Sequence, residues 1–380
     1  MDKRKLIIIS AVNIIDGGAL VVLIDTLKAF NEIASINNVK ILCLVNSKEF
    51  FLHLNLKYIK FMSFPKVKKR WVNRVFFEYV LSYILSRRML PDVWFCMHDI
   101  SANVIANKRF VYCHNPSPFY RFKLKDIIYE PKLVVFSLFY KFLYRIGIKN
   151  NTNVFVQQNW IANSFSERYN ISNVVVSHPD KVSGIHKLSV EDKIDVDCLI
   201  SSYRDSKIVI YPAYPRIFKN FEVIAECAKK SIANHDNIHY IFTLNGSENK
   251  YSKYLFNKYK HLDNISWVGI RPHAYIDYLY TKSDLVCFPS KLETWGLPIS
   301  EAVSHKLPLC CADLPYAHES SGLYEYVNFF DPDSSDDLYN NIVLALAGKF
   351  KPRRECVSSV NVIEGWYGLA EYILGDTHDS

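Results

Sequence analysis

Two glutamates on either side of a glycine have the spacing of a site for a phosphorylated sugar. Glu293 and Glu301 flank Gly296 in this chain of 380 residues. Leu297 and Pro298 follow the glycine and predict a helix, because proline suits the first helical turn, where its missing N–H is not needed. The free N–H groups of a helix N-terminus attract phosphate, and carboxylates accept hydrogen bonds from hydroxyls. We expect a pocket for a nucleotide-linked sugar; the alternative is a surface loop whose glutamates complement the helix dipole.

Short strands and helices alternate around these residues. The apolar run Leu285–Phe288 precedes the loop and is typical of a strand buried on both faces of a parallel sheet. Further strands are expected at residues 6–9, 41–45, 93–97, 110–113, 154–158, 174–176, 207–211, 240–244, 265–269 and 308–313. Helices are expected at residues 19–33, 160–168, 221–230, 274–280, 331–346 and 366–374. This alternation, repeated in two halves, predicts two doubly wound α/β domains with functional loops at the carboxyl ends of the strands.

Residues 289–302 read P-S-K-L-E-T-W-G-L-P-I-S-E-A and resemble the frame P-S-x-x-E-x-x-G-L-P-x-x-E-A of the retaining glycosyltransferase family 4, or glycosyl transferases group 1. The whole frame is specific, whereas its E-x7-E core alone is weak. Thr294 stands where many members carry glycine. The resemblance implies the GT-B fold, in which two Rossmann-like domains face a cleft and a C-terminal helix crosses back to the first domain. It also implies that the N–H groups of Gly296 and Leu297 hold the donor diphosphate, while Glu293 binds sugar hydroxyls and Glu301 ribose hydroxyls.

A second segment, residues 211–220, reads Y-P-A-Y-P-R-I-F-K-N and resembles the family variant Y-P-A-x-P-x-x-x-K-N. The resemblance implies that Lys219 binds the donor diphosphate; outside this frame it would be a solvent-facing lysine. Arg216 is a candidate helper, although its spacing differs from the Arg–Lys pair common in the family. Gly269 ends an expected strand near which the family lines its base-binding pocket.

The first half of the chain offers two loop signals. Gly17 and Gly18 follow the first expected strand, and His114 follows the strand at residues 110–113. Taken alone, a glycine pair is most often a turn, and a single histidine is most often structural. Their positions after parallel strands place both loops at the same sheet edge. The resemblance implies that the glycine loop lies against the donor phosphate or the acceptor, and that His114 contacts the donor sugar or phosphate.

The formal net charge of +8 indicates an acidic partner, and nucleic acid, anionic lipid and diphosphate substrates all qualify on charge. Seven Lys or Arg residues alternate with six aromatic residues in the stretch 57–77. This pattern favours a surface for anionic lipid, with a solvated basic face as the alternative. No segment reaches the roughly 18 uncharged apolar residues that span a bilayer. We expect a cytoplasmic protein, peripheral on the inner face of the cytoplasmic membrane, that binds no nucleic acid.

Nine cysteines, an odd number without a C-x-x-C pair, predict reduced and mostly buried thiols and no structural zinc. Asp195-Val196-Asp197 imitates the D-x-D metal motif of other glycosyltransferases, but it falls in an expected linker. We therefore expect no metal and no cofactor besides the donor substrate. The expected domains are residues 1–182 on the acceptor side, a linker at 183–205, a nucleotide-sugar domain at 206–360, and a closing helix and tail at 361–380.

Together these features predict a glycosyltransferase. The expected reaction moves a hexose, with retention, from a nucleoside-diphosphate sugar to a carbohydrate acceptor, a lipid-linked oligosaccharide. Synthesis of a cell-surface polysaccharide such as the O-antigen of lipopolysaccharide fits this reaction. Two alternatives stay open at this point: a sugar-nucleotide epimerase on the same fold, and a non-catalytic subunit that binds a nucleotide sugar. The presence of Lys219, Glu293 and Glu301 argues against the non-catalytic subunit.

Overall fold

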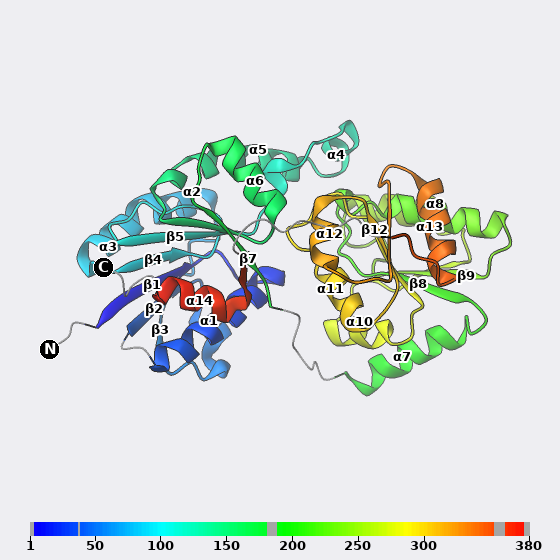
Figure 1. The fold of residues 1–380 in the computed structure, drawn as a ribbon, viewed down its shortest axis with the longest axis horizontal. Coiled ribbons are helices and arrows are strands. Elements are labelled where there is room, and N and C mark those ends of the chain that lie inside the picture. Colours follow the sequence, from blue (N-terminus) through cyan, green and yellow to red (C-terminus); the bar gives the residue numbers. More distant parts are fainter. Residues whose placement is uncertain (1–3, 37–38, 181–187, 353–361, 376–380) are drawn as a thin grey trace. The chain divides into compact units, whose positions relative to one another are not determined.

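The computed structural model of the chain describes residues 4–36, 39–180, 188–352 and 362–375. The chain forms two compact units (Figure 1). The first contains Met1–Phe119, Ser137–Lys181 and Ser359–Ser380, and the second contains Tyr120–Phe136 and Val182–Ser358. The predicted boundaries at 182–183 and 360–361 lie outside the described residues.

The first unit is built on an eight-stranded sheet in which every strand pair is parallel. Its order is β14-β7-β6-β5-β4-β1-β2-β3. The strands are β1 (Lys5–Ala11), β2 (Val39–Val45), β3 (Ile59–Ser63), β4 (Val93–Cys96), β5 (Lys108–Cys113), β6 (Asn153–Val156), β7 (Val174–His178) and β14 (Val362–Glu364). The strand order reverses between β1 and β4, which is the position where doubly wound sheets bind ligands.

Helices cover both faces of this sheet (Figure 1). Helices α1 (Gly17–Ile36) and α14 (Gly365–Gly375) pack against each other and share one hydrophobic core with the sheet. Helices α5 (Pro131–Arg145) and α6 (Asn159–Tyr169) lie on the other face. They are accompanied by α2 (Trp71–Phe76), a π-helical turn (Phe77–Leu81) and α3 (Ser82–Met89). Because α14 belongs to the first unit, the predicted return of the C-terminal helix is confirmed.

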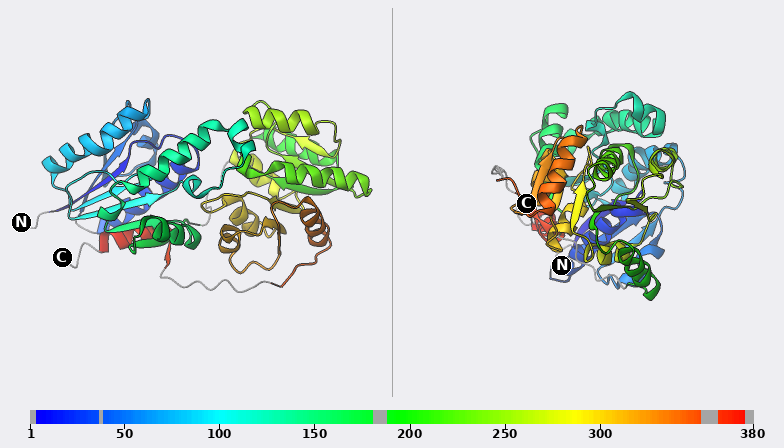
Figure 2. Two further views of the ribbon diagram at one scale, coloured as in Figure 1. Left: turned by 90° about the horizontal axis from the view of Figure 1, so that it is seen from above. Right: turned by 90° about the vertical axis from the view of Figure 1, so that its right-hand side faces the viewer.

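The second unit repeats this architecture on a six-stranded parallel sheet of order β10-β9-β8-β11-β12-β13. Figure 2 shows its helices around the strands in two further views. Its strands are β8 (Lys207–Tyr211), β9 (Ile238–Phe242), β10 (Ile265–Trp267), β11 (Leu285–Phe288), β12 (Leu309–Ala312) and β13 (Val327–Phe330). Its helices are α4 (Leu124–Tyr129), α7 (Val190–Ser201), α8 (Phe221–Ala233), α9 (Lys250–Tyr259), α10 (His273–Tyr280), α11 (Leu297–Ser304), α12 (Pro315–Ser321) and α13 (Ser335–Leu346). The fold class predicted from the sequence, two doubly wound α/β domains, is confirmed.

Helix α7 occupies residues 190–201 of the segment that the sequence predicts as a linker. Val196 is the one fully buried residue of this helix. Because so few of its residues face a core, the apolar periodicity that would predict a helix is weak. Asp195 pairs with Arg271 at 2.9 Å, and Asp197 accepts a hydrogen bond from Tyr278 at 2.8 Å. The two aspartates therefore attach α7 to the region of α10, and the D-x-D spacing has a structural explanation.

The segment Tyr120–Phe136 lies in the middle of the first unit's sequence but groups with the second unit, an excursion that the sequence did not predict. The Glu130 carboxylate is 2.8 Å from Arg216 and accepts the N–H of Ile217 at 3.0 Å. Lys125 pairs with Glu222 at the start of α8. These polar contacts hold α4 beside the loop that carries Lys219.

The basic and aromatic stretch 57–77 divides into an interior and an exterior part. Phe61 in β3 stacks on Phe51 with ring centroids 5.2 Å apart, and Phe77 is 1% exposed. Trp71 and Phe76 are 41% and 54% exposed. The alternation of basic and aromatic residues in the sequence did not distinguish the buried aromatic residues from the exposed ones. In the described part of the chain, no helix combines the length and apolarity needed to cross a membrane.

The eight cysteines in the described residues are free, and all except Cys198 are buried; Cys356 lies outside those residues. Burial raises the pKa of the Cys96 thiol to about 12. The expectation of buried thiols is therefore confirmed for seven of the eight cysteines in the described residues.

Candidate functional site

Lys219 and Glu293 meet at the topological switch point of the second sheet. Strands β8 and β11 are parallel neighbours, and the strand order reverses between them. Lys219 follows β8, and Glu293 follows β11, so both reach the carboxyl edge of the sheet. The Lys219 ammonium forms an ion pair with the Glu293 carboxylate, and their side chains are 16% and 13% exposed. The structure thus brings together two residues that the sequence selected 74 positions apart.

The backbone around Lys219 is held firmly at the end of β8. Residues Ile217–Lys219 form a 3₁₀ turn, and Asn220 has a φ of 59° where that turn gives way to α8. The Tyr211 hydroxyl donates to the Lys219 carbonyl at 2.8 Å. The Lys219 Nζ lies 5.6 Å from the ring centroid of Phe288, the last residue of β11. These contacts fix the cation beside the end of β11.

Gly296 starts helix α11 in a conformation that requires glycine. Its φ is 86°, in the left-handed region. A Cβ at this position would lie 3.3 Å from both Ile299 Cδ1 and Phe288 Cε1, closer than ordinary packing. Leu297 is the first residue of α11, and Pro298 stands in its first turn, as predicted. The N-terminus of α11 therefore follows the Glu293 loop and presents its free N–H groups there.

Glu301 is held by two side chains that the sequence analysis missed. Its Oε2 accepts from the Tyr280 hydroxyl at 2.8 Å, and its Oε1 lies 3.1 Å from His273 Nε2. The hydrogen bond to Glu301 raises the pKa of His273, with burial acting in the opposite direction. His273 and Tyr280 are seven residues apart on α10 and share one helix face. Their spacing of seven residues is the sequence signal that could have identified them as partners on one helix face.

Arg216 and Gly269 have different surroundings. Arg216 is paired with Glu130, so its guanidinium already has an anionic partner in this structure. Gly269 follows β10 with a φ of 74°, and a Cβ there would lie 3.0 Å from the Asn245 amide nitrogen. Gly269 is thus required by the close approach of Asn245, which lies three residues after the end of β9.

His114, Gly17 and Gly18 belong to the first unit. His114 Nε2 is 2.9 Å from the Met97 carbonyl, and the His114 backbone N–H donates to Asp99 at 2.6 Å. Because a carbonyl only accepts, Nε2 carries the proton, and Nδ1 is the acceptor of the neutral ring. Burial lowers the pKa of His114, which favours this neutral form. Gly17 begins α1 with a φ of 66°, whereas a Cβ at Gly18 would meet open space.

A second buried cluster in the first unit was also missed. Glu78, in the π-helical turn, is fully buried, and its Oε1 is 2.5 Å from His98 Nε2. His98 Nδ1 is 2.9 Å from the Ser10 carbonyl, so Nδ1 carries a proton. Burial raises the pKa of Glu78 to about 8 and lowers the pKa of His98. A protonated Glu78 therefore donates to His98 just after β4, and Arg74 donates to the His98 carbonyl at 2.8 Å.

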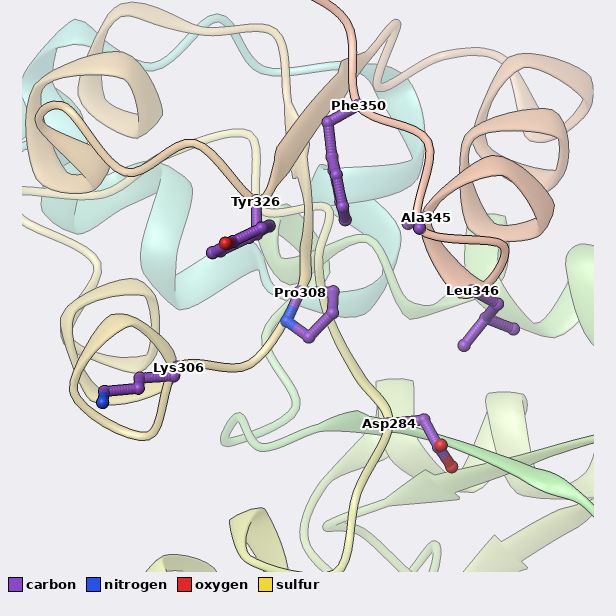
Figure 3. Close-up of a pocket in the computed structure, with 8 residues that line it drawn as sticks. Asp284, Lys306, Pro308, Tyr326, Ala345, Leu346 and Phe350 are labelled. Carbon is purple, nitrogen blue, oxygen red and sulfur yellow. The ribbon is translucent and has the colours of Figure 1, made fainter.

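Figure 3 shows a separate pocket of about 400 Å³ in the second unit. Asp284, Pro308 and Tyr326 line it, and each directly precedes a strand, so the pocket lies at the amino ends of β11, β12 and β13. Asp284 accepts the Ile208 N–H at 2.8 Å and pairs with Lys207 at 2.9 Å. This pocket is at the edge opposite to Glu293 and holds none of the predicted site residues.

The site at the carboxyl edge offers a cation, a helix N-terminus and two carboxylates. Lys219 and the N–H groups of α11 are suited to a diphosphate, and Glu293 and Glu301 are suited to hydroxyl groups. Among the residues that the structure describes, no group of three or more His, Cys, Asp or Glu side chains is arranged to hold a metal ion.

Comparisons with known proteins agree with this geometry. The family model of glycosyl transferases group 1 matches residues 200–359, which contain Lys219, Glu293 and Glu301. No curated protein matches the chain. Among solved structures, a glycosyltransferase from Rickettsia africae is similar at a TM-score of 0.62 and 14% identity, with 90% of this chain and 88% of that chain covered.

Two further solved structures are similar over nearly their whole length. The lipopolysaccharide outer core galactosyltransferase WaaB superposes at a TM-score of 0.58 and 14% identity, with 92% of each chain covered. The Anabaena protein HepE in complex with UDP-glucose superposes at a TM-score of 0.58 and 14% identity, with 99% of this chain and 100% of that chain covered. These likenesses show the GT-B fold.

Proposed function

We propose that this chain, a glycosyltransferase of the GT-B fold whose residues 200–359 match the family model of glycosyl transferases group 1, moves a hexose from a nucleoside-diphosphate sugar to a carbohydrate acceptor with retention. The ion pair between Lys219 and Glu293 at the switch point of the second sheet carries this proposal. A cation suited to phosphate and a carboxylate suited to hydroxyl groups thus follow two adjacent strands. The complex of HepE with UDP-glucose supports a donor of this class.

In the proposed donor complex, the diphosphate replaces Glu293 as the main partner of Lys219. The N–H groups at Gly296 and Leu297 bind the same diphosphate, and Glu301, oriented by Tyr280 and His273, accepts from the ribose hydroxyls. Glu293 then accepts from hydroxyls of the sugar. During transfer the bond from the anomeric carbon to phosphate breaks while the acceptor oxygen bonds to the same face. The proton of the acceptor hydroxyl passes to the leaving phosphate. Lys219 stabilises the negative charge that develops on that phosphate.

We further propose that the acceptor is a lipid-linked oligosaccharide used to build a cell-surface polysaccharide such as the O-antigen. Peripheral attachment to the cytoplasmic face of the membrane brings the enzyme to such an acceptor. The exposed cations Lys66, Lys68, Lys69 and Arg70 support this attachment. Each Lys or Arg near an anionic surface contributes about 1 kcal/mol and is weakened by salt. The resemblance of the fold to WaaB, a lipopolysaccharide galactosyltransferase, is consistent with this setting.

Thermal unfolding with a panel of nucleotide sugars tests the donor site. A donor at 100 times its Kd stabilises the folded protein by about 2.7 kcal/mol, so we expect UDP- or GDP-linked hexoses to raise the melting temperature. Lys219→Ala should abolish the increase. Lys229→Ala, which changes an exposed lysine on α8, should retain it. An equal response of both variants would place the donor elsewhere.

The stabilising donor is then incubated with total membrane lipid as the source of acceptor, with and without EDTA. We expect radiolabelled hexose to enter the lipid fraction, and we expect EDTA to leave the rate unchanged. Release of an epimerised nucleotide sugar without any transfer would contradict glycosyl transfer. Loss of transfer with EDTA, restored by magnesium or manganese, would contradict the proposed metal independence.

A further inference from the structure

Helix α5 exposes an apolar face instead of burying it. Val135, Leu138, Phe139 and Phe142 are 67%, 56%, 38% and 62% exposed. Their spacing of three, one and three residues places them on one side of the helix. The opposite side is already buried through Leu133, Tyr140, Leu143 and Tyr144. The exposed face is therefore additional to the core that holds α5 in place.

Helix α2 continues this apolar face. The Trp71 ring contacts Phe139 edge to face, with centroids 4.9 Å apart, and lies 6.0 Å from the ring of Tyr140. Val72 and Phe76 on the same short helix are 76% and 54% exposed. We call Trp71, Val72, Phe76, Leu138, Phe139 and Phe142 the α2–α5 surface; α2 and α5 are labelled in Figure 1. All six residues belong to the first unit.

The α2–α5 surface is attached rigidly from behind. Arg74, on the buried side of α2 and 4% exposed, donates to the Tyr140 hydroxyl at 2.7 Å and to the His98 carbonyl at 2.8 Å. Tyr140 belongs to α5, and His98 follows β4. Both helices are thus connected to each other and to the sheet.

The charged residues of the two segments that form the surface are all cations, of which Lys68 pairs with Asp16 at 3.3 Å. Residues 131–150 contain the cations Lys132, Lys141, Arg145 and Lys149 and no Asp or Glu. Residues 64–77, which lead into and form α2, contain five Lys or Arg residues and likewise no Asp or Glu. A second copy of this chain would bring the same cations against themselves in a two-fold interface. Anionic lipid is complementary to both the apolar centre and the cationic surroundings.

We infer that the α2–α5 surface inserts its apolar side chains into the interface of an anionic lipid bilayer. This inference rests on the proposed function and deepens it, because the cations at Lys66–Arg70 explain attraction to the membrane but not residence in it. The apolar side chains add a part of the binding free energy that salt does not screen. Aromatic residues such as Trp71 and Phe142 are suited to this interfacial depth.

Vesicle sedimentation separates the two contributions. The full chain is mixed with phosphatidylcholine vesicles containing about a third phosphatidylserine, in low and in high sodium chloride. The apolar variant combines Leu138→Asn with Phe142→Asn, and the cation variant changes Lys66, Lys68, Lys69 and Arg70 to Ser. Leu52→Asn, which removes a leucine that is 68% exposed elsewhere in the first unit, is the control.

We expect the wild-type chain and the control to bind at low salt and to retain part of that binding at high salt. The apolar variant should bind about tenfold or more weakly at both salt concentrations, given the area that two large side chains bury. The cation variant should lose mainly the part that salt removes. Circular dichroism and the melting temperature establish that each variant is folded. Wild-type binding by the apolar variant at high salt overturns the inference.

Quenching by brominated lipid measures insertion directly. The difference in quenching between the wild-type chain and Trp71→Phe reports Trp71 alone, and we expect a clear difference. Insertion is contradicted if quenching does not depend on Trp71. It is also contradicted if light scattering shows a dimer that becomes a monomer in the apolar variant. The donor's effect on the melting temperature should be unchanged in the apolar variant. If the wild-type chain does not bind vesicles but is still stabilised by the donor, this inference is rejected and the proposed donor site is retained. If no donor stabilises the wild-type chain, the proposed function is rejected.

Discussion

At the scale of single residues, the charged groups of the proposed donor site are paired with protein side chains. Lys219 is paired with Glu293, and Glu301 is hydrogen-bonded by Tyr280 and His273. These three charged side chains thus have protein partners in the structure. Substrate therefore exchanges partners with them, and the effect of each substitution depends on what its partner does afterwards.

Substitutions at the three residues should have different kinetic effects. Glu301→Ala should act mainly on the donor KM, because ribose hydroxyls do not change during the reaction. Glu293→Ala should act mainly on kcat, because its carboxylate lies near the reacting ring. Loss of a hydrogen bond to a charged group costs roughly 1.5–3 kcal/mol, or about 10- to 150-fold. Lys219→Ala should exceed both, since it leaves the departing diphosphate without its cation.

Steady-state kinetics of the three alanine variants, with circular dichroism as the folding control, provides the measurement. Lys219→Gln and Lys229→Ala are matched controls for shape and for the loss of an exposed lysine. A fully active Lys219→Ala, or equal modest losses in all three variants, would show that the donor site lies elsewhere.

His273 should make stability depend on pH through Glu301. The hydrogen bond to Glu301 raises the pKa of His273 above its ordinary 6.5. The resulting stabilisation is fully present below pH 6.5 and is lost as the pH rises through the raised value. The difference in melting temperature between the wild-type chain and His273→Gln should therefore be larger at pH 5.5 than at pH 9. His261→Gln, at an exposed position, is the control. A difference that grows towards pH 9 would contradict the ion pair.

At the scale of elements, the sequence predicted the strands that carry the chemistry and missed much of what surrounds them. Strands β8 and β11 are short runs with apolar residues buried on both faces, and a proline follows each soon after its end. The apolar composition and these prolines were sufficient to predict both strands. Helix α7 has one fully buried residue and gave no usable periodicity. The apolar run in α5 was visible, but sequence cannot tell a face that packs inside from one that stays exposed.

The same limit applies to the site. Glu293, Glu301 and Lys219 were selected by their local frames, and the structure brings Lys219 and Glu293 together. His273 and Tyr280 contact Glu301 from 28 and 21 residues earlier in the chain. Such partners are set by how α10 packs beside α11, and this tertiary information is not present in a local pattern. Arg216 was also selected by its local frame, but its partner Glu130 lies in the segment Tyr120–Phe136, whose grouping with the second unit was not predicted.

Glu78 should make the π-helical turn sensitive to alkaline pH. Burial raises its pKa from an ordinary 4.5 to about 8, so the folded state holds this proton more tightly than the unfolded chain. The corresponding stabilisation is fully present below pH 4.5 and is lost as the pH rises through about 8. Glu78→Gln keeps a donor for His98 but does not titrate. Between pH 6 and pH 9 the wild-type chain should lose on the order of 2 kcal/mol more stability than Glu78→Gln.

Urea unfolding at the two pH values provides the measurement for Glu78, and Glu49→Gln, at an exposed position in the same unit, is the control. Parallel losses in the wild-type chain and Glu78→Gln would show that Glu78 does not hold a proton in the folded state.

At the scale of the whole molecule, each unit is a doubly wound sheet, but the first unit is completed by the far end of the chain. Strand β14 pairs with β7, and α14 packs against α1. Trp366, Leu369 and Ile373 of α14 are at most 2% exposed and lie in the first unit's core. Stability of the first unit should therefore depend on residues beyond the second unit.

Trp366→Ala should destabilise the first unit by about 3–5 kcal/mol, as expected for removal of a buried tryptophan. The Trp366 ring lies 5.5 Å from that of Tyr112, and its backbone N–H donates to Asp180 at 3.1 Å. Tyr367→Ala, at a neighbouring position that is 42% exposed, should change stability by no more than about 0.5 kcal/mol. Urea unfolding followed by circular dichroism compares the two, and equal stabilities would contradict the assignment of α14 to this core.

The return of α14 also fixes an order of events on the ribosome. The chain passes between the two units four times, and the last passage leads to β14 and α14. Chains emerge from their N-termini, and domains fold as units during synthesis. The second unit has all its described elements once Leu346 of α13 has emerged, whereas the first unit still lacks the helix that packs on α1. The domain whose synthesis starts first is thus finished last, and until then the part of α1 that packs against α14 lacks this partner.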